Sequence, residues 1–249
     1  MTRIMIIGGG SEIANAIARS LHQSKKGSEI LLIGRSGASM DRAIAINTEI
    51  FGEYKCRTIE CDFMDPQLTA ITVRNAVIDF QPTISVLAAG INIIEPKSLD
   101  TIQMSLVNFV SMCTAGEEIL SHGKGAEKSS LIVLSSIASF RPRPTNYNYG
   151  SSKAGLDFWA EGAMTTIQKP TEIILIRLGK VSTSSSLSHP WAPFTQTPVS
   201  VGLRIAELVG RGTRTIWIPR ILGLVAFVLL LLPKNIWIKL SIRQSKDNN

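Results

Sequence analysis

Seven short apolar segments recur along the chain, and they constrain its fold more than any other feature. They lie at 3–7, 29–34, 56–61, 83–89, 130–136, 172–177 and 215–218, and each gap between them is long enough for a crossover helix. Short, nearly continuous runs of Ile, Val and Leu are typical of strands in a parallel sheet that is buried on both faces. The repeated strand–helix alternation therefore predicts an α/β fold with a doubly wound parallel sheet.

The length and composition of the chain are those of a single domain. It has 249 residues, of which 45% are hydrophobic and 18% charged, so a large core is available and disorder is not expected. Cys56, Cys61 and Cys113 show neither the CxxC spacing nor the histidine pairing of a zinc site or a disulfide framework. The opening "MTRIMIIGGG" has no signal-peptide core. These features predict a cytoplasmic protein without a metal site.

The carboxyl-terminal segment departs from the strand–helix plan. Residues 221–232 read "ILGLVAFVLLLL", an uncharged apolar run that is shorter than the roughly 20 residues needed to span a bilayer. Two tryptophans and six cations surround it, namely Trp217, Trp237, Arg214, Arg220, Lys234, Lys239, Arg243 and Lys246. We therefore expect a domain over 1–219 and an apolar, basic extension over 220–249. The extension is either a buried terminal helix or, as its flanks favour, a segment at the membrane interface or against a lipid substrate.

The formal net charge of +7 is compatible with three kinds of anionic partner. A basic protein can bind nucleic acid, an anionic membrane or an anionic substrate. The chain has no nucleic-acid recognition motif and no basic block interleaved with aromatic residues. We therefore exclude nucleic acid and expect peripheral contact with the inner face of the cell membrane.

A run of glycines follows the first predicted strand, in "IIGGGSEIANAIA". Glycines at a strand–helix turn let the backbone approach a pyrophosphate, which then lies at the amino terminus of the helix. The spacing differs from the usual G-x-G-x-x-G, and a tight turn without a ligand is the alternative. The position directly after the first strand favours dinucleotide binding by Gly8 and Gly10.

The choice between NAD and NADP depends on the end of the second predicted strand, "LLIGRSG". An acid at this point binds the ribose hydroxyls of NAD, whereas an arginine accommodates the 2′-phosphate of NADP. Gly34 stands where an acid would, and Arg35 follows it, which favours NADPH. Asp62 is the candidate for holding the adenine end. Its alternative is an ordinary loop acid before a helix that starts at Asp65.

The stretch "TNYNYGSSKAGLDFW" holds a candidate acid–base pair, Tyr149 and Lys153. Residues four apart in a helix share a face, so the ammonium of Lys153 would lie beside the phenol. A nearby cation favours phenolate, and so would the nicotinium of an oxidised cofactor. Lowering the pKa of the phenol from 10 to about 7 requires roughly 4 kcal/mol, which two close cations in a dry cleft would supply. Tyr147 has only Ser151 at the same offset. We therefore expect Tyr149 to be the reactive phenol.

Two further polar residues extend this candidate site. Ser136 ends the fifth predicted strand, and the carboxyl ends of parallel strands are where such sheets bind ligands. Its hydroxyl could hold a substrate carbonyl against the phenol. Asn108 lies in the helical segment before that strand and could anchor a water behind Lys153. Taken singly, these residues could be a serine cap, a buried asparagine and a surface lysine.

Together these residues resemble the catalytic tetrad of the short-chain dehydrogenase/reductase family, over nearly the whole chain. The resemblance implies a Rossmann-type sheet, NAD(P)H as cofactor, a homo-oligomer, and Asn108, Ser136, Tyr149 and Lys153 as catalytic residues. It also implies cofactor contacts from Gly8, Gly10, Ser11, Glu12, Ile13, Arg35, Asp62, Phe63, Ala89, Gly90, Tyr149, Lys153, Val181 and Thr183. The chain departs from the family in its shorter glycine turn, in "LAAG" at 87–90 and in Leu178 before Gly179.

Finer similarity is to one branch of that family. The segments "GGGSEIA", "YGSSKAGLDFW", "IRLGKVST" and "LLPKNIWIKL" are similar to reductases of decaprenylphosphoryl-2-keto-pentose. This implies reduction of a lipid-phosphate-linked keto-sugar to an arabinose donor for the cell wall, after a flavin-dependent oxidase. Arg141, Arg143 and Lys180 are then candidates for binding the phosphate.

Two other functions remain possible from the sequence. One is the reduction of a different apolar ketone, either acyl or steroid-like. The other is a catalytically silent dinucleotide-binding protein, which would not need the tetrad. A hydrolase is a poor interpretation, because the chain has no GxSxG and His22, His122 and His189 have no triad or metal spacing.

Overall fold

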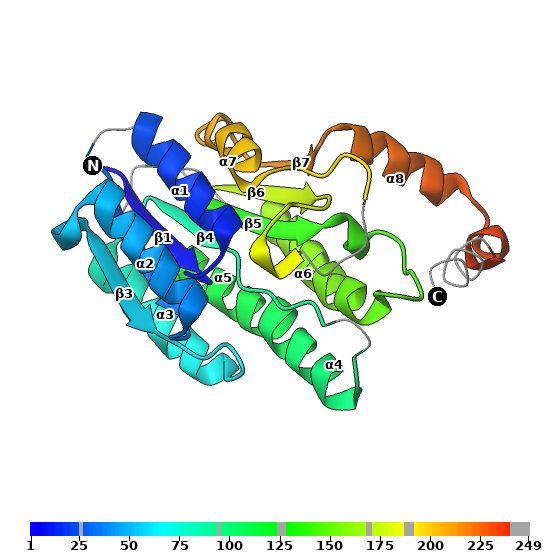
Figure 1. Cartoon of the computed structure of the whole chain (residues 1–249), viewed down its shortest axis with the longest axis horizontal. Helices are drawn as coiled ribbons and strands as arrows, with labels where there is room; N and C mark the ends of the chain where they lie inside the picture. Colours follow the sequence, from blue (N-terminus) through cyan, green and yellow to red (C-terminus); the bar gives the residue numbers. More distant parts are fainter. Residues whose placement is uncertain (25–26, 94–95, 124–127, 168–170, 187–191, 240–249) are drawn as a thin grey trace.

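The computed structural model describes residues 1–24, 27–93, 96–123, 128–167, 171–186 and 192–239. Seven parallel strands form one sheet in the order β3-β2-β1-β4-β5-β6-β7 (Figure 1). The strands are β1 Arg3–Ile7, β2 Glu29–Gly34, β3 Cys56–Glu60, β4 Ile84–Leu87, β5 Ser129–Ser136, β6 Thr171–Leu178 and β7 Arg214–Ile218. This confirms the predicted doubly wound sheet, and each predicted strand lies within a few residues of its observed position.

Helices cover both faces of the sheet (Figure 1). They are α1 Glu12–Ser24, α2 Ala38–Phe51, α3 Pro66–Phe80, α4 Ser98–Ser105, α5 Ser111–His122, α6 Tyr147–Thr166, α7 Pro198–Ala206 and α8 Ile221–Leu231. One apolar cluster joins the sheet to α1, α2 and α7, and a second joins it to α3, α5 and α6. The sheet is therefore the middle of three layers.

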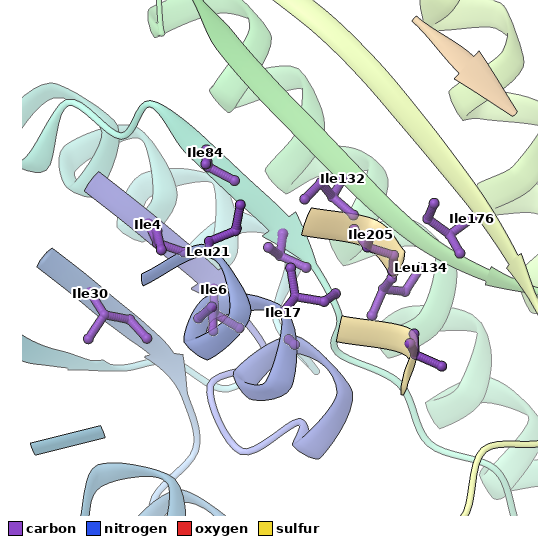
Figure 2. Packing of buried hydrophobic residues seen from close by; sticks show 14 of the residues in the cluster. Ile4, Ile6, Ile17, Leu21, Ile30, Ile84, Ile132, Leu134, Ile176 and Ile205 are labelled. Carbon is purple, nitrogen blue, oxygen red and sulfur yellow. The ribbon is translucent and has the colours of Figure 1, made fainter. Parts of the chain in front are cut away.

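Alternation along each strand supplies both cores. In β1, Ile4 and Ile6 belong to the cluster under α1, and Met5 and Ile7 belong to the cluster on the opposite face. None of these four side chains has any exposed surface. Figure 2 shows Ile4 and Ile6 of β1 together with Ile17 and Leu21 of α1 in the first cluster. A strand buried on both faces must be apolar throughout, which is why the strands appear in the sequence as continuous runs.

The order of the strands places the ligand-binding edge of the sheet. The chain winds outward from β1 to β3 in one direction, and from β4 to β7 in the other. Such a switch point opens a crevice at the carboxyl ends of the central strands. β4 ends at Leu87 because the amides of Ala88 and Ala89 both donate to the carbonyl of Ile7, which turns the chain under the end of β1.

The apolar run forms α8, which extends along one edge of the molecule beyond β7 (Figure 1). Only Leu222 and Ala226 of this helix are buried. In this structure the run is therefore not the buried terminal helix that was one of the two alternatives. No helix in the described ranges is long and apolar enough to cross a membrane. Arg243 and Lys246 of the predicted flanks lie outside the described residues.

Candidate active site

Three elements carry the four residues of the predicted tetrad. Tyr149 and Lys153 lie in the first two turns of α6, and Ser136 is the last residue of β5. Asn108 lies in a π-helical turn, Leu106–Val110, between α4 and α5. π-Helical turns inside helices are often found at functional sites, because the extra residue re-aims a side chain.

Asn108 has no exposed surface, and three hydrogen bonds hold its side chain. Its Oδ1 accepts from the amide of Ile91 at 2.7 Å, and its Nδ2 donates to the carbonyl of Ile91 at 2.8 Å. Nδ2 also donates to Ser152 Oγ at 3.0 Å. A Cβ added at Gly90 would lie 3.3 Å from Lys153 Nζ and 3.5 Å from Asn108 Oδ1. The turn after β4 thus passes against both polar side chains.

Ser152 was not among the predicted site residues, although it connects two of them. Its hydroxyl donates to the carbonyl of Tyr149 at 2.8 Å while it accepts from Asn108. A buried serine in the sequence YGSSK has no distinctive signal, because only the fold shows that a side chain from another helix reaches it.

The phenol of Tyr149 is held in its neutral form. Burial raises the pKa of Tyr149 above its ordinary value, and a hydrogen bond with Ser136 opposes the rise. In the protein alone, desolvation of the phenolate outweighs its stabilisation, so a lowering toward 7 would need the nicotinium that the prediction included beside Lys153. A neutral phenol is the form that can donate a proton to a developing alkoxide. Tyr147, only two residues before Tyr149 but 57% exposed, lies outside this arrangement.

Lys153 is almost completely buried, with 5% of its surface exposed. Its Nζ donates to the carbonyl of Leu134 in β5 at 3.1 Å. Burial lowers the pKa of Lys153 to about 8, because the charged form loses its hydration. The group stays mostly protonated at neutral pH and provides a cation beside the first turn of α6.

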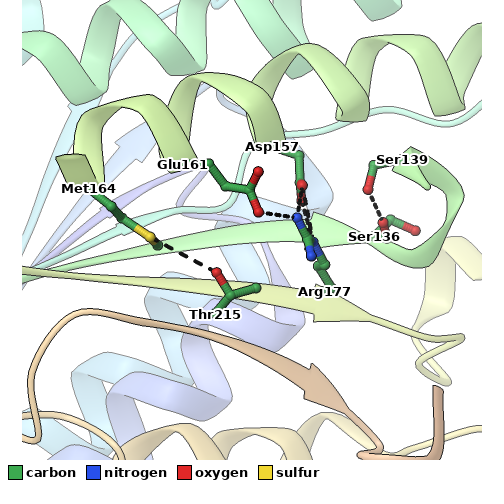
Figure 3. Close-up of polar contacts among 7 residues, drawn as sticks. All are labelled: Ser136, Ser139, Asp157, Glu161, Met164, Arg177 and Thr215. Carbon is green, nitrogen blue, oxygen red and sulfur yellow. Dashed lines mark hydrogen bonds and ion pairs between the residues drawn. The ribbon is translucent and has the colours of Figure 1, made fainter. Parts of the chain in front are cut away.

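Ser136 is oriented by the turn that follows it. Its Oγ accepts from the amide of Ala138 at 3.1 Å, and its carbonyl accepts from Ser139 Oγ at 2.7 Å, as Figure 3 shows for the second contact. These bonds start a short 3₁₀ turn, Ile137–Ser139, directly after β5. The hydroxyl is thereby held at the carboxyl edge of the sheet, near Tyr149.

The glycine turn between β1 and α1 has the shape that a dinucleotide requires. Gly8 has a φ of +100°, and a Cβ at this position would overlap the backbone nitrogen of Ala89. The amides of Gly8 and Gly9 both donate to the carbonyl of Ile33 at 2.8 Å. The first-turn amides of α1, those of Glu12 and Ile13 included, have no carbonyl partner within the helix and suit a pyrophosphate.

A buried asparagine pair holds this turn, and it was not predicted. Asn15 Nδ2 donates to the carbonyls of Gly9 at 2.6 Å and Ser11 at 2.8 Å. Asn47 of α2 donates to Asn15 Oδ1 at 2.5 Å. The signal was present in the sequence, since Asn15 interrupts the small and apolar residues of "IANAIA". An uncharged polar residue on the core face of a helix needs a buried partner.

Glu12 joins the glycine turn to the loop after β6. Its Oε1 accepts from the amide of Ser184 at 2.8 Å and from the Ser184 hydroxyl. Val181 and Thr183, the predicted nicotinamide contacts, lie on the same loop, and Val181 is buried. The Glu12 side chain therefore brings together two segments that were predicted to bind the pyrophosphate and the nicotinamide of the cofactor.

The predicted adenine end is open to solvent. Arg35 is exposed after β2 and forms no ion pair within the described residues. Asp62 is also exposed, and its Oδ1 accepts from the amide of Met64 at 3.1 Å. Asp65 caps α3, as the alternative for this loop required. Phe63, which was also predicted to contact the cofactor, is buried in the core, unlike the exposed Arg35 and Asp62.

The three predicted phosphate-binding cations have different environments. Nη2 of Arg141 donates to the carbonyls of Leu229 at 2.8 Å and Leu232 at 2.7 Å, so this side chain caps the carboxyl terminus of α8. Arg143 is half-buried, and no ion pair or side-chain hydrogen bond of the described residues involves it. Burial lowers the pKa of Arg143 below its ordinary value. Lys180 is half-buried beside Gly179.

An ion-pair cluster beneath the site was also not predicted. Arg177 of β6 binds Asp157 of α6 with Nη2–Oδ2 2.5 Å, and Glu161 with Nη2–Oε1 2.5 Å (Figure 3). Its guanidinium lies 5.3 Å from the ring centroid of Phe140 and 5.1 Å from that of Trp217. The cluster connects α6, β6 and β7 directly behind the turn that follows Ser136.

Comparisons with known proteins agree with this geometry. Residues 2–189 match the short chain dehydrogenase family. An uncharacterized oxidoreductase of Mycobacterium tuberculosis (strain ATCC 25618 / H37Rv) is 29% identical over 241 residues, which are 94% of this chain and 95% of that protein. An uncharacterized oxidoreductase of Streptomyces coelicolor is 28% identical over 251 residues, covering 96% of each.

A solved structure gives the same result for the fold. The alcohol dehydrogenase of the archaeon Thermococcus sibiricus, complexed with 5-hydroxy-NADP, superposes with a TM-score of 0.74 at 18% identity. The match covers 87% of this chain and 96% of that one. With the family match over most of the sequence, the site and the sheet lead to one conclusion: the chain is an oxidoreductase that belongs to the short-chain dehydrogenase family.

Proposed function

We propose that this protein uses NAD(P)H to reduce a lipid-phosphate-linked 2-keto-pentose to the arabinose form, in the synthesis of a cell-wall or surface-glycan precursor. The observation that supports this substrate class most directly is a pair of features, one on the loop that leads into Tyr149 and the other in α8. Arg143 is a half-buried cation without a polar partner among the described residues, and α8 is an exposed apolar helix. A polyprenyl phosphate has the complementary chemistry, an anionic head on a long apolar chain.

The residues of the site divide the reduction between them. NAD(P)H, when bound, supplies the hydride that the ketone carbon accepts. Ser136 donates a hydrogen bond to the carbonyl oxygen as it gains negative charge, and Tyr149 transfers its proton to that oxygen. Lys153 stabilises the phenolate that remains and holds the nicotinamide ribose. Asn108 supports a water relay that returns the proton.

The cofactor fits the turn between β1 and α1 and the loop after β6. The shape of the turn at Gly8 and Gly10, the hydroxyl of Ser11, the amides of Glu12 and Ile13, and the backbone at Ala89 and Gly90 suit a dinucleotide with its pyrophosphate at the amino terminus of α1. The exposed Arg35 favours the 2′-phosphate of NADPH, and the Thermococcus sibiricus relative in fold carries an NADP derivative.

The proposed substrate implies partners and a location. A 2-keto-pentose must be formed from the hydroxy-sugar by an oxidase, and a flavin-dependent enzyme is the class we propose. The prenyl chain of the substrate would hold the protein, as a homo-oligomer, at the inner face of the cell membrane.

A second candidate is the reduction of another apolar ketone, such as an acyl or steroid-like one. The apolar α8 favours it equally, whereas the unpaired Arg143 does not, because a neutral substrate offers no anion. A silent binding protein is the weakest candidate, since it has no use for the hydrogen-bonded tetrad.

The test is a substrate panel with purified protein. NADPH and NADH oxidation would be followed with a polyprenyl-phospho-2-keto-pentose, the same keto-pentose phosphate without its prenyl chain, a β-ketoacyl thioester and a ketosteroid. We expect turnover of the prenyl phosphate, with NADPH preferred. Arg143→Gln should raise KM for that substrate about tenfold or more, as expected for loss of a charge-assisted contact, without weakening NADPH binding. Faster turnover of either neutral ketone, with no effect of Arg143→Gln, would reject the lipid-phosphate proposal.

A further inference from the structure

The strongest unexplained feature outside the catalytic site is the surface of α8. Six large apolar side chains of this helix are between 41% and 68% exposed, namely Ile221, Leu224, Phe227, Val228, Leu230 and Leu231. The helix contains no polar side chain, so no face of it is suited to water. Ile236 and Ile238, in the helical turn at 234–239, extend the same exposed apolar surface. We call this set the α8 surface.

The chain on either side of α8 carries only positive charge. Residues 208–246 contain seven Lys or Arg and no Asp or Glu. The rest of the chain contains 19 basic residues (Lys and Arg) and 19 acidic residues (Asp and Glu). The whole formal charge of +7 therefore resides in this segment. Arg220 precedes α8, Lys234 and Lys239 follow it, and all three are exposed.

The α8 surface is fixed to the loops that frame the active site. Arg141 caps α8 through the carbonyls of Leu229 and Leu232, and its guanidinium lies 5.5 Å from the ring centroid of Trp237. Trp237 Nε1 donates to the carbonyl of Pro142 at 2.8 Å. These contacts connect the carboxyl end of α8 and the helical turn after it to the loop between Ser136 and Tyr149. They hold α8 in place with its apolar side chains outward.

We propose that the α8 surface docks on an anionic lipid bilayer, with α8 lying in the plane of the interface. A helix that is too short to cross the bilayer, apolar on its exposed side and bordered by cations and tryptophans has the chemistry of an interfacial segment. The charge distribution favours an anionic bilayer as the partner of this surface over a second copy of the chain. Two copies of an acid-free, cation-bordered surface would bring like charges together, whereas an anionic headgroup layer complements them.

Docking in this way has a consequence for the proposed reaction, and this part rests on the proposed function. The hydrogen bonds of Arg141 and Trp237 place the α8 surface beside the loop that leads into Tyr149. A substrate whose prenyl chain stays in the membrane would then reach the site without leaving the lipid. Membrane binding itself needs no substrate, so it can be tested separately from the reaction.

The experiment is co-sedimentation of the full chain with vesicles. Vesicles of phosphatidylcholine with equal phosphatidylglycerol are compared with pure phosphatidylcholine at physiological salt. We expect binding to the anionic vesicles only, reduced at high salt because the Debye length shortens. Leu224→Ser with Phe227→Ser should weaken binding about tenfold or more. Lys234→Gln with Lys239→Gln should weaken it about tenfold or more, at roughly fivefold per cation.

Matched variants elsewhere on the surface decide whether α8 is the cause. Ile71→Ser with Ile78→Ser removes two exposed apolar side chains from α3, and Arg42→Gln with Lys55→Gln removes two exposed cations. Neither should change vesicle binding. Equal losses in these controls, or no binding to anionic vesicles, would overturn the proposal. So would a Leu224→Ser and Phe227→Ser variant that binds vesicles normally but loses its oligomeric state in sedimentation velocity, since α8 would then contact a second copy.

Discussion

The region behind the active site buries charged side chains, whereas the α8 surface exposes apolar ones. Around β6 and α6, charged groups are buried and paired, as in the bond between Arg177 and Asp157. On α8, apolar groups are exposed and unpaired, as in Leu224 and Phe227. Each arrangement costs free energy in an isolated soluble protein. The first cost is offset inside the molecule, whereas the second has no internal compensation, and this is why α8 indicates an external partner.

The two regions also differ in how firmly the rest of the fold holds them. The site residues are held by bonds from other elements, such as Ile91 on Asn108 and Leu134 on Lys153. α8 contributes few buried side chains, and Arg141 supplies its main polar attachment. Substitutions in the first region should therefore change stability or catalysis strongly, and most substitutions on α8 should leave the folded protein unchanged.

The largest effect on stability should come from Arg177→Met. This variant leaves Asp157 buried without its partner, and breaking such a pair costs about 3–5 kcal/mol of unfolding free energy. Chemical denaturation would measure the loss. The matched control is Arg57→Met, whose exposed pair with Asp79 should contribute less than about 1 kcal/mol. Equal losses in both variants would show that the buried cluster has no special role.

Lys153→Met tests the cost of burying the catalytic cation. The pKa of Lys153 falls from 10.5 in the unfolded chain to about 8 in the fold, so its charged form destabilises the protein by about 3 kcal/mol below pH 8. Between pH 8 and 10.5 the unfolded state binds more protons, and wild-type stability should rise with pH. The variant should thus be more stable at pH 7 by up to about 3 kcal/mol, with the difference shrinking as pH increases. A difference that does not vary with pH would contradict this account.

Arg141→Gln examines the attachment of α8. Hydrogen bonds from a charged donor contribute about 1.5–3 kcal/mol, so the amides of α8 should lose about that much protection in hydrogen exchange. Amides of β1 and β4 should be unaffected. Arg220→Gln, which removes an exposed cation at the other end of α8, is the control and should have little effect. Protection that persists in Arg141→Gln would mean that apolar packing alone holds the helix.

The smallest effect is expected for exposed positions of α8 in solution. Leu224→Ser should change the free energy of unfolding by less than about 1 kcal/mol, because 60% of Leu224 is already in water. Leu222→Ala in the same helix should cost about 2–5 kcal/mol, since Leu222 packs against Gly179. If both variants lose the same stability, the exposed face is not free in the folded protein.

The sequence predicted the sheet well because its evidence is local. Strands such as 3–7 and 29–34 need only their own apolar residues to be recognised, and their positions were confirmed. Tyr149 and Lys153 were found because a spacing of four residues is also local. The individual roles of the tetrad and cofactor residues remain proposals.

Features that depend on distant segments could not be predicted in the same way. Ser152, Asn47 and Arg177 owe their roles to partners that are 44, 32 and 20 residues away in the sequence. Arg141 was expected to face a phosphate and instead reaches α8, 88 residues further on. Burial raises the pKa of Tyr149 in the protein alone, an opposing effect that the sequence could not show, because the extent of burial is a property of the whole fold.

The most direct test of the central claim compares two tyrosines of the same helix. Tyr149→Phe and Tyr147→Phe each remove one hydroxyl, the first from a half-buried side chain at the site and the second from an exposed one. NADPH oxidation with the lipid-phosphate keto-pentose should fall about 10²–10⁴-fold in Tyr149→Phe, with NADPH binding retained, and should be unchanged in Tyr147→Phe. Full turnover in Tyr149→Phe, or equal losses in both variants, would contradict the assignment of Tyr149 as the proton donor.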